Sequence, residues 1–142
     1  MGFSTHLCRN IFYKIGFMDN LSEITEKIIG AAYKVSNTLG SGFLEKVYEN
    51  ALFIEIKKAG LIVAKQHALQ VFYDDQVVGD YFVDLFIENE VVVELKTARV
   101  ITDIHQARLM NYLIACNRRC GLIINFGKPR VEIKRMLNGY NL

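Results

Sequence analysis

The chain has 142 residues, of which 51% are hydrophobic and 23% are charged, and these values predict one globular domain with a substantial core. The formal net charge of +2 neither requires nor excludes a nucleic-acid partner, because a local basic patch can supply the attraction. The three cysteines, Cys8, Cys116 and Cys120, cannot all pair within the chain and lack a CxxC motif, so we expect free thiols in the reducing cytoplasm.

Residues 1–17 do not share the regular pattern of the rest of the chain. Their apolar runs are short, with neither a signal-peptide core nor a small-residue cleavage site. Either translation starts at Met18 or this segment packs at the periphery of the domain. We therefore treat residues 1–17 as an N-terminal segment of uncertain role and assign residues 18–142 to a single domain. No apolar run reaches the roughly 18 residues that a membrane-spanning helix needs, so no membrane partner is expected.

Two amphipathic helices are predicted next. In residues 21–39 apolar side chains recur every three or four positions, and Ser22 is a candidate cap. Gly40-Ser41-Gly42 ends this helix. The second helix extends over about residues 43–59, and Gly60 follows it, as glycine commonly does after a helix.

The pattern then changes to alternation with β-branched residues. Strands are predicted at 68–73, 76–87 and 91–96, joined by turns at Asp74-Asp75 and at Glu88-Asn89-Glu90, which makes an antiparallel meander. The 76–87 strand carries bulky residues on both faces, so helices are expected on both sides of the sheet. One face of this strand is expected to carry Tyr81, Val83 and Leu85, and the other face Phe82 and Phe86.

The last third of the chain predicts a crossover. Thr102 or Asp103 caps a helix that extends to about Asn117. The residues expected to face inward from it are Ile104, Leu109, Met110, Leu113 and Ile114. Residues 121–126 are continuously apolar, which suits a buried strand parallel to the third one. Residues 130–137 fit an edge strand or a short helix. The predicted fold class is therefore α/β, with a mixed sheet of an antiparallel three-strand meander plus a parallel strand after a crossover helix, flanked by helices.

Glu94 and Lys96 lie on the same face of the third predicted strand. Burying two charges is costly unless they pair, bind a metal or take part in chemistry. If residues 88–90 form a three-residue loop, the register places Asp84 directly opposite Glu94. Opposed carboxylates repel each other unless one is protonated or a divalent cation lies between them, and Mg²⁺ prefers such oxygen ligands. Lys96 could then position water or stabilise negative charge.

Two predicted helices add polar groups. Gly42, Glu45 and Tyr48 form the pattern GxxExxY, and Glu45 borders the buried stripe of its helix. The simpler interpretations are a first-turn glutamate that complements the helix dipole and, for Tyr48, a core aromatic residue. Gln106 begins the buried face of the later helix, near the strand end from which Lys96 emerges, and otherwise it is a capping-turn glutamine. The histidines show no ligand spacing and are expected at the surface or in caps; they are His6, His67 and His105.

Over about residues 21–135 the ordered motifs resemble those of the GxxExxY proteins, a family of the PD-(D/E)xK nuclease superfamily. The motifs are Gly42-Glu45-Tyr48, Asp84, Glu94-Leu95-Lys96, Gln106, Asn111-Tyr112-Leu113 and GLIINFG. The resemblance implies a restriction-endonuclease-like core and Mg²⁺-dependent hydrolysis of phosphodiester bonds, with Mn²⁺ as a substitute and DNA as the expected substrate. One departure is Val83, which stands where the motif has a proline.

The resemblance also implies roles by position. Asp84 and Glu94 would bind the metal, and the carbonyl of Leu95 would be a further ligand. Lys96 would orient or activate water. Glu45 would be the acid contributed by a helix, ligating the metal directly or through water, and Gln106 would be the polar residue of the following helix.

Two other hypotheses stay open. The chain could be a non-catalytic module that keeps the nuclease fold and binds nucleic acid or protein, or Glu94 and Lys96 could simply form a salt bridge along their strand. A homo-oligomer or a protein partner is compatible with the nuclease and with the module. Basic residues over which nucleic acid could approach are Lys57, Lys58, Lys65, Arg118, Arg119, Lys128 and Arg130.

Overall fold

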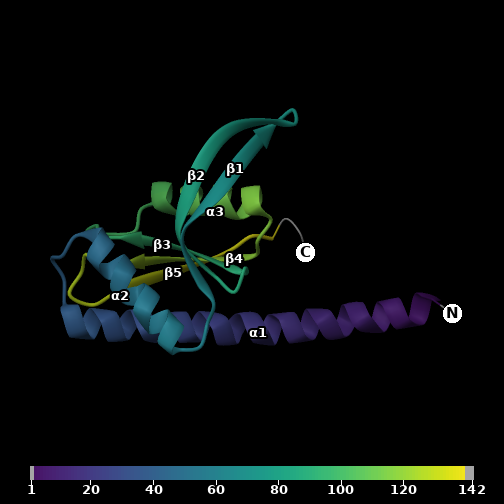
Figure 1. Ribbon diagram of the computed structural model, residues 1–142, viewed down its shortest axis with the longest axis horizontal. Coiled ribbons are helices and arrows are strands. Elements are labelled where there is room, and N and C mark those ends of the chain that lie inside the picture. Colours follow the sequence, from purple (N-terminus) through teal and green to yellow (C-terminus); the bar gives the residue numbers. More distant parts are fainter. Residues whose placement is uncertain (1, 140–142) are drawn as a thin grey trace.

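The computed structural model describes residues 2–139, with side chains from Asn20 onward (Figure 1). In chain order the elements are α1 (Gly2–Leu39), α2 (Glu45–Lys58), β1 (Val63–Tyr73), β2 (Gln76–Ile87), β3 (Val91–Lys96), α3 (Asp103–Cys116), β4 (Cys120–Asn125) and β5 (Glu132–Leu137). The strands form one sheet in the order β1-β2-β3-β4-β5. Only β3 and β4 pair in parallel, which confirms the predicted mixed sheet and assigns residues 132–137 to an edge strand.

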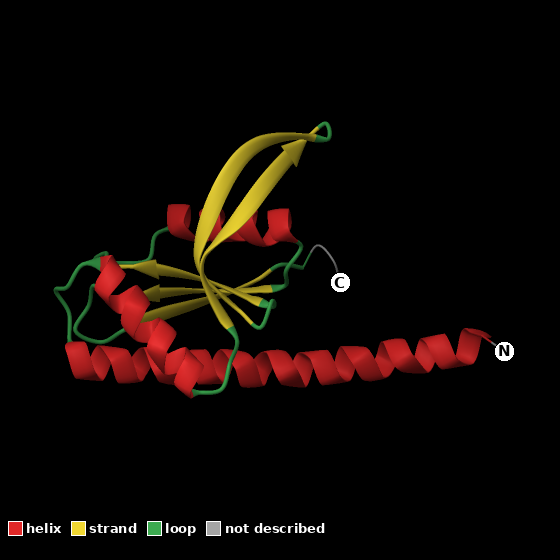
Figure 2. Cartoon of the chain, in the orientation of Figure 1, coloured by secondary structure: helices red, strands yellow, loops and turns green. Residues whose placement is uncertain are grey.

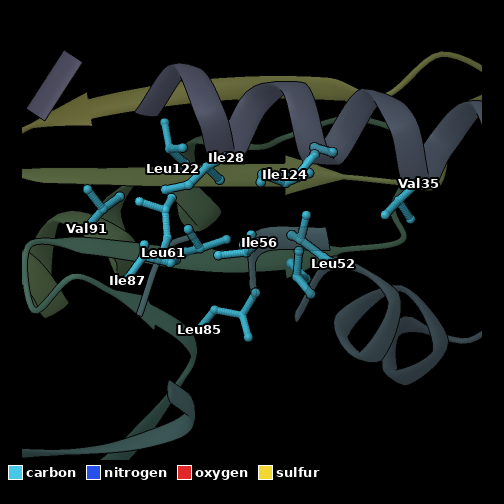
Figure 3. Packing of buried hydrophobic residues seen from close by; sticks show 14 of the residues in the cluster. Ile28, Val35, Leu52, Ile56, Leu61, Leu85, Ile87, Val91, Leu122 and Ile124 are labelled. Atoms are coloured by element: carbon cyan, nitrogen blue, oxygen red, sulfur yellow. The ribbon is translucent and has the colours of Figure 1, made fainter. Parts of the chain in front are cut away.

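Helices cover both faces of the sheet, as the apolar strands predict. Helices α1 and α2 pack on one face and α3 packs on the other (Figure 1). Figure 3 shows the larger core, in which Ile28 and Val35 of α1 and Leu52 and Ile56 of α2 meet strand residues such as Ile124. The smaller core lies beneath α3 and contains Leu69, Val83, Phe86, Val92, Leu109, Leu113 and Ile123. Of the described helices, none combines the length and apolar character needed to cross a membrane.

Helix α1 begins at Gly2 rather than near residue 21. The segment contains no proline, so nothing in the backbone ends the helix where the apolar pattern changes. Ser22 therefore lies inside α1 and is not its cap; its carbonyl accepts a hydrogen bond from Thr25 Oγ1 at 3.0 Å. The assignment of residues 1–17 to a separate segment and of 18–142 to one domain stays a prediction, and residues 140–142 lie outside the described part of the chain.

Strands β1 and β2 extend beyond the sheet as a two-stranded arm (Figure 2). Strand β2 pairs with β3 only at residues 85–87, and β1 is longer than predicted because its first residues pair with this part of β2. The expected face of Val83 was wrong: Val83 packs beneath α3, whereas Leu85 packs against α1 and α2. Strand β2 thus twists at Asp84, opposite Gln66, which has a φ of 50°. The arm leaves Tyr81 and Phe82 exposed.

Helix α3 begins at Asp103, and Thr102 before it is the cap, in a reciprocal capping box with His105. This confirms Thr102 as the cap and His105 as a capping residue. Leu109 and Leu113 face the core as expected, but Ile104 and Ile114 are 70% and 47% exposed. Their predicted inward orientation was wrong, because both side chains line a groove between α3 and the β1–β2 arm and not the core beneath α3.

Candidate active site

Asp84 and Glu94 come together where β2 separates from β3. The pairing of the two strands ends at Leu85 opposite Val93, and its register is the predicted one. Beyond that point each carboxylate accepts a hydrogen bond from the backbone of the other strand: Leu95 N–H donates to Asp84 Oδ2 at 2.8 Å, and Asp84 N–H donates to Glu94 Oε1 at 3.2 Å. We call this point the fork. The side chains replace ladder bonds that the separating strands no longer make.

The backbone of Leu95 contributes a further acceptor at the fork. Leu95 itself is buried in the larger core, so its side chain points away from the carboxylates. The N–H and C=O groups of one strand residue point to the same side, and the Leu95 N–H points at Asp84. The Leu95 carbonyl therefore faces the gap that β2 leaves.

Helix α2 brings two more carboxylates to the fork. Glu45 is its first residue, and Glu49 follows one turn later. Both line a cleft of about 230 Å³ together with Asp84, Gln66 and Leu95. Glu49 is only 3% exposed and was not predicted, although its spacing from Glu45 places it on the same helical stripe.

Glu49 is a buried acid with one polar partner at each carboxylate oxygen. Its Oε1 accepts a hydrogen bond from Gln66 Nε2, whose amide also donates to Asp84 Oδ1 at 3.3 Å. Its Oε2 forms an ion pair with Lys46 but accepts no hydrogen bond of good geometry. Gln66 thus links the acid of the helix to the acid of the strand, and it too was missed by the sequence analysis. Its left-handed backbone conformation has no sequence signature.

The pattern GxxExxY has a structural explanation in the loop before α2. Gly42 has a φ of 114°, which only glycine adopts without strain. Tyr48 is fully buried and stacks on Phe126, with ring centroids 4.7 Å apart, which confirms it as a core aromatic residue. Its hydroxyl donates to the Gly40 carbonyl at 2.6 Å and accepts from Phe43 N–H at 3.3 Å. The tyrosine thereby fixes the loop that starts α2 at Glu45.

Side-chain hydrogen bonds also fix the loop between β3 and α3. Asn125, fully buried at the end of β4, accepts from Ala98 N–H at 3.0 Å and donates to the Ala98 carbonyl at 2.9 Å. Glu132 accepts from Ile101 N–H at 2.9 Å, farther along the same loop. These bonds hold the chain between Lys96 and α3 against the sheet, and they position the lysine beside the fork.

The charges of the predicted site residues influence one another's pKa values. Burial, followed by the negative charge of Asp84, raises the pKa of Glu94 to about 8, while Lys96 opposes this shift. Burial also raises the pKa of Asp84 and of Glu45, and Lys96 again acts in the opposite direction. Burial and the repulsion between neighbouring carboxylates thus outweigh the charge of Lys96, so Glu45, Asp84 and Glu94 hold protons more tightly than free carboxyl groups do.

Lys96 is half-buried, and the described residues include no ion pair between it and Glu94. The hypothesis of a salt bridge along the strand is thus not supported. Gln106 lies half-buried in the first turn of α3. Its backbone N–H donates to the Thr102 carbonyl, and its side chain makes no hydrogen bond to a described residue. The charges of Glu45, Asp84 and Glu94 are thus each coupled to Lys96, whereas no described hydrogen bond joins Gln106 to them.

The stability of the protein without metal should depend on Glu94 and pH. The pKa of this carboxyl is about 8 when folded and near 4.5 when unfolded, so the folded state holds the proton more tightly. The free energy of unfolding should therefore fall as pH rises from about 5 to 8, by up to about 1.4 kcal/mol per pH unit from this group. Urea denaturation in EDTA should show a shallower fall for Glu94→Gln. An equal slope in both proteins would contradict the shift.

The donor set at the fork fits a hard divalent cation. It consists of carboxylates and a carbonyl, the oxygen ligands that Mg²⁺ prefers. The charge of Asp84 contributes to the raised pKa of Glu94, so these carboxylates repel each other, and a cation between them would relieve that repulsion. Within residues 20–139, however, no three acidic, histidine or cysteine side chains are grouped as metal ligands. Asp84 Oδ2 and Glu94 Oε1 accept backbone hydrogen bonds instead.

The helix-covered mixed sheet, with acids at its fork and a lysine beside them, defines a restriction-endonuclease-like α/β protein. Residues 22–136 match the family model described as the PD-(D/E)XK nuclease superfamily, so the chain belongs to that superfamily. The crystal structure of SSO0001 has a similar fold, with a TM-score of 0.53 and 16% identity over 66% of this chain. The similarity spans 49% of the SSO0001 chain, about half its length. No curated protein matches the sequence.

Proposed function

We propose that the protein is a metal-dependent nuclease that hydrolyses phosphodiester bonds in DNA, and that it is a GxxExxY member of its superfamily. The observation that carries this proposal is the fork, where Asp84 and Glu94 meet beside Lys96 and Glu45 enters from α2. The fixed loop around Gly42 and Tyr48 supports the family assignment. The free thiols of Cys116 and Cys120 support the expected location in the cytoplasm.

Asp84 and Glu94 would hold Mg²⁺, with the Leu95 carbonyl and Glu45 as further ligands. When bound, this cation supplies Lewis-acid activation of the phosphodiester and of the attacking water. The amino group of Lys96 holds that water or stabilises negative charge as it develops on the phosphate oxygens. Gln106, at the start of α3, positions the substrate near the lysine. The N-terminus of α2 adds a positive potential behind Glu45.

The superfamily also suits a second function, a module that binds nucleic acid without cleaving it. The observation that favours it is the grouping of carboxylates around backbone N–H groups rather than around a common centre. Such a module would bind DNA in a salt-dependent way and would show no turnover. A homo-oligomer or protein partner is compatible with either function.

Cleavage of single- and double-stranded DNA and RNA tests the proposal. Turnover is expected with Mg²⁺ or Mn²⁺ and none with EDTA. Mn²⁺ alone should raise the melting temperature of the wild type, because a ligand that binds only the folded state stabilises it. Asp84→Asn should lose both effects, while Glu26→Gln, an exposed change of the same kind on α1, should keep both. Salt-sensitive binding without turnover would support the module instead.

A further inference from the structure

A groove of about 760 Å³ lies between the β1–β2 arm and α3. It is larger than the cleft at the fork, and most of its wall is apolar or aromatic. Phe72 and Tyr81 of the arm line one side, and Ile104 and Tyr112 of α3 line the other. Phe72 is 60% exposed and Tyr81 is 45% exposed, so large apolar groups face solvent here. A concentration of such groups on a soluble domain usually marks a binding surface.

The aromatic groups form a platform. The rings of Tyr81 and Tyr112 lie 5.5 Å apart between centroids, at an interplanar angle of 48°. They join the arm to α3 across the groove, and Phe72 continues the apolar surface along the arm. Exposed aromatic faces of this kind accept the flat faces of nucleobases, whatever the base sequence.

The polar groups of the groove suit a phosphate-linked ligand. Arg108 is the one charged residue among those that line it, so the groove carries a cation and no carboxylate. No ion pair to a described residue neutralises Arg108. Asn111 adds an amide, which can pair with the edge of a base. A basic, aromatic groove is complementary to a polyanion that exposes its bases.

The groove adjoins the proposed site of cleavage. Tyr81 lies three residues before Asp84 on β2, and its ring contacts Tyr112 of α3. Tyr112 thus lies beside the part of β2 that leads to Asp84, and burial and, next, the charge of Glu94 raise the pKa of this tyrosine. A chain that leaves the fork along β2 towards Tyr81 therefore reaches the groove.

We propose that this groove binds unpaired bases of single-stranded DNA, stacked on Tyr81 and Tyr112, while the adjoining phosphate lies at the fork. The inference rests on the proposed function and names its substrate class. Bases in a duplex are stacked on each other and must first be unpaired, at a cost in free energy, before they can occupy the groove. Single strands and the unpaired ends of duplexes are therefore the preferred ligands.

The test is fluorescence anisotropy of full-length protein with labelled oligothymidylate, a blunt duplex of equal length, and oligouridylate, in EDTA so that hydrolysis does not interfere. Wild type should bind the oligothymidylate at least about tenfold more tightly than the duplex. Tyr81→Ala should weaken this binding by about tenfold or more, and Tyr81→Phe should restore it, because stacking needs the ring and not the hydroxyl. Tyr73→Ala, exposed at the arm tip outside the groove, should bind like wild type.

Arg108→Gln provides a second measure that does not depend on the arm. It should reduce the dependence of log Kd on log salt by about 0.7, the slope of one single-strand phosphate contact. Equal affinity for single strand and duplex, or unchanged binding by Tyr81→Ala, would overturn the inference. Self-association of the wild type that Tyr81→Ala abolishes would assign the groove to a second copy and overturn it as well. A preference for single strands without turnover would support the binding role of the groove and contradict the proposed nuclease activity.

Discussion

Lys96→Met is expected to lower the rate of metal-dependent hydrolysis at least about a hundredfold, the effect of removing one group that stabilises a transition state. Methionine keeps most of the apolar stem of this half-buried side chain and removes the charge. Lys96 is the one cation whose charge opposes the raised pKa of Glu45, Asp84 and Glu94 alike, so its loss removes the positive charge that these three acids share.

The same variant separates chemistry from metal binding. Lys96 is not among the proposed ligands, and loss of its charge leaves the carboxylates less neutralised. The melting-temperature increase caused by Mn²⁺ should therefore persist or grow in Lys96→Met. Lys27→Met, an exposed lysine on α1, is the matched control and should have normal turnover. Normal turnover in Lys96→Met would remove the lysine from the mechanism, whereas loss of both turnover and the Mn²⁺ effect would indicate a misfolded site.

Gly127→Ala is expected to reduce the free energy of unfolding by about 3 kcal/mol, at the upper end for overpacking. A Cβ at this position would lie 2.4 Å from the Ala98 carbonyl oxygen and 2.6 Å from the Ala98 nitrogen. Both contacts are with backbone atoms of the loop after β3, which Asn125 also binds, so the loop cannot move aside without losing those hydrogen bonds.

Gly30→Ala is the control for Gly127→Ala. Gly30 lies within α1, and a Cβ there would have no heavy atom within 4 Å. Alanine should stabilise the helix by up to about 1 kcal/mol. Urea denaturation of both variants measures the difference. The loop that Gly127→Ala would displace connects Lys96, the last residue of β3, to α3. The variant should therefore also lower turnover at temperatures where it remains folded. Two variants of equal stability would show that the loop is not tightly packed.

The sequence was sufficient for much of the fold because turns and alternation are local properties. The bounds of β2 and β3 were predicted correctly, and the length of the loop at residues 88–90 fixed the register that places Asp84 beside Glu94. The capping residue Thr102 and the buried Tyr48 were also predictable, since a cap and an apolar stripe each follow from spacing.

What the sequence could not predict depends on contacts between distant residues. The twist of β2 at Asp84 reverses the face of Val83, and it arises opposite a left-handed Gln66 that no local rule requires. The burial of Glu49 depends on Gln66, which is 17 positions away in the chain. Ile104 is exposed because it lies on the side of α3 that lines the groove beneath the arm and not on the side that meets the core. Each of these is decided by tertiary packing, which overrides the local pattern.

The two hydrogen bonds that cross the fork also determine how mutagenesis of this protein is read. Asp84 and Glu94 each cap an amide of the neighbouring strand, so they terminate the sheet as well as carrying charge. Alanine at either position would leave a backbone N–H group without its acceptor as well as remove a carboxylate. Loss of activity in an alanine variant could therefore come from a disturbed sheet or from lost catalysis. Isosteric amides retain an acceptor oxygen, so asparagine and glutamine are the substitutions that report on the charge alone.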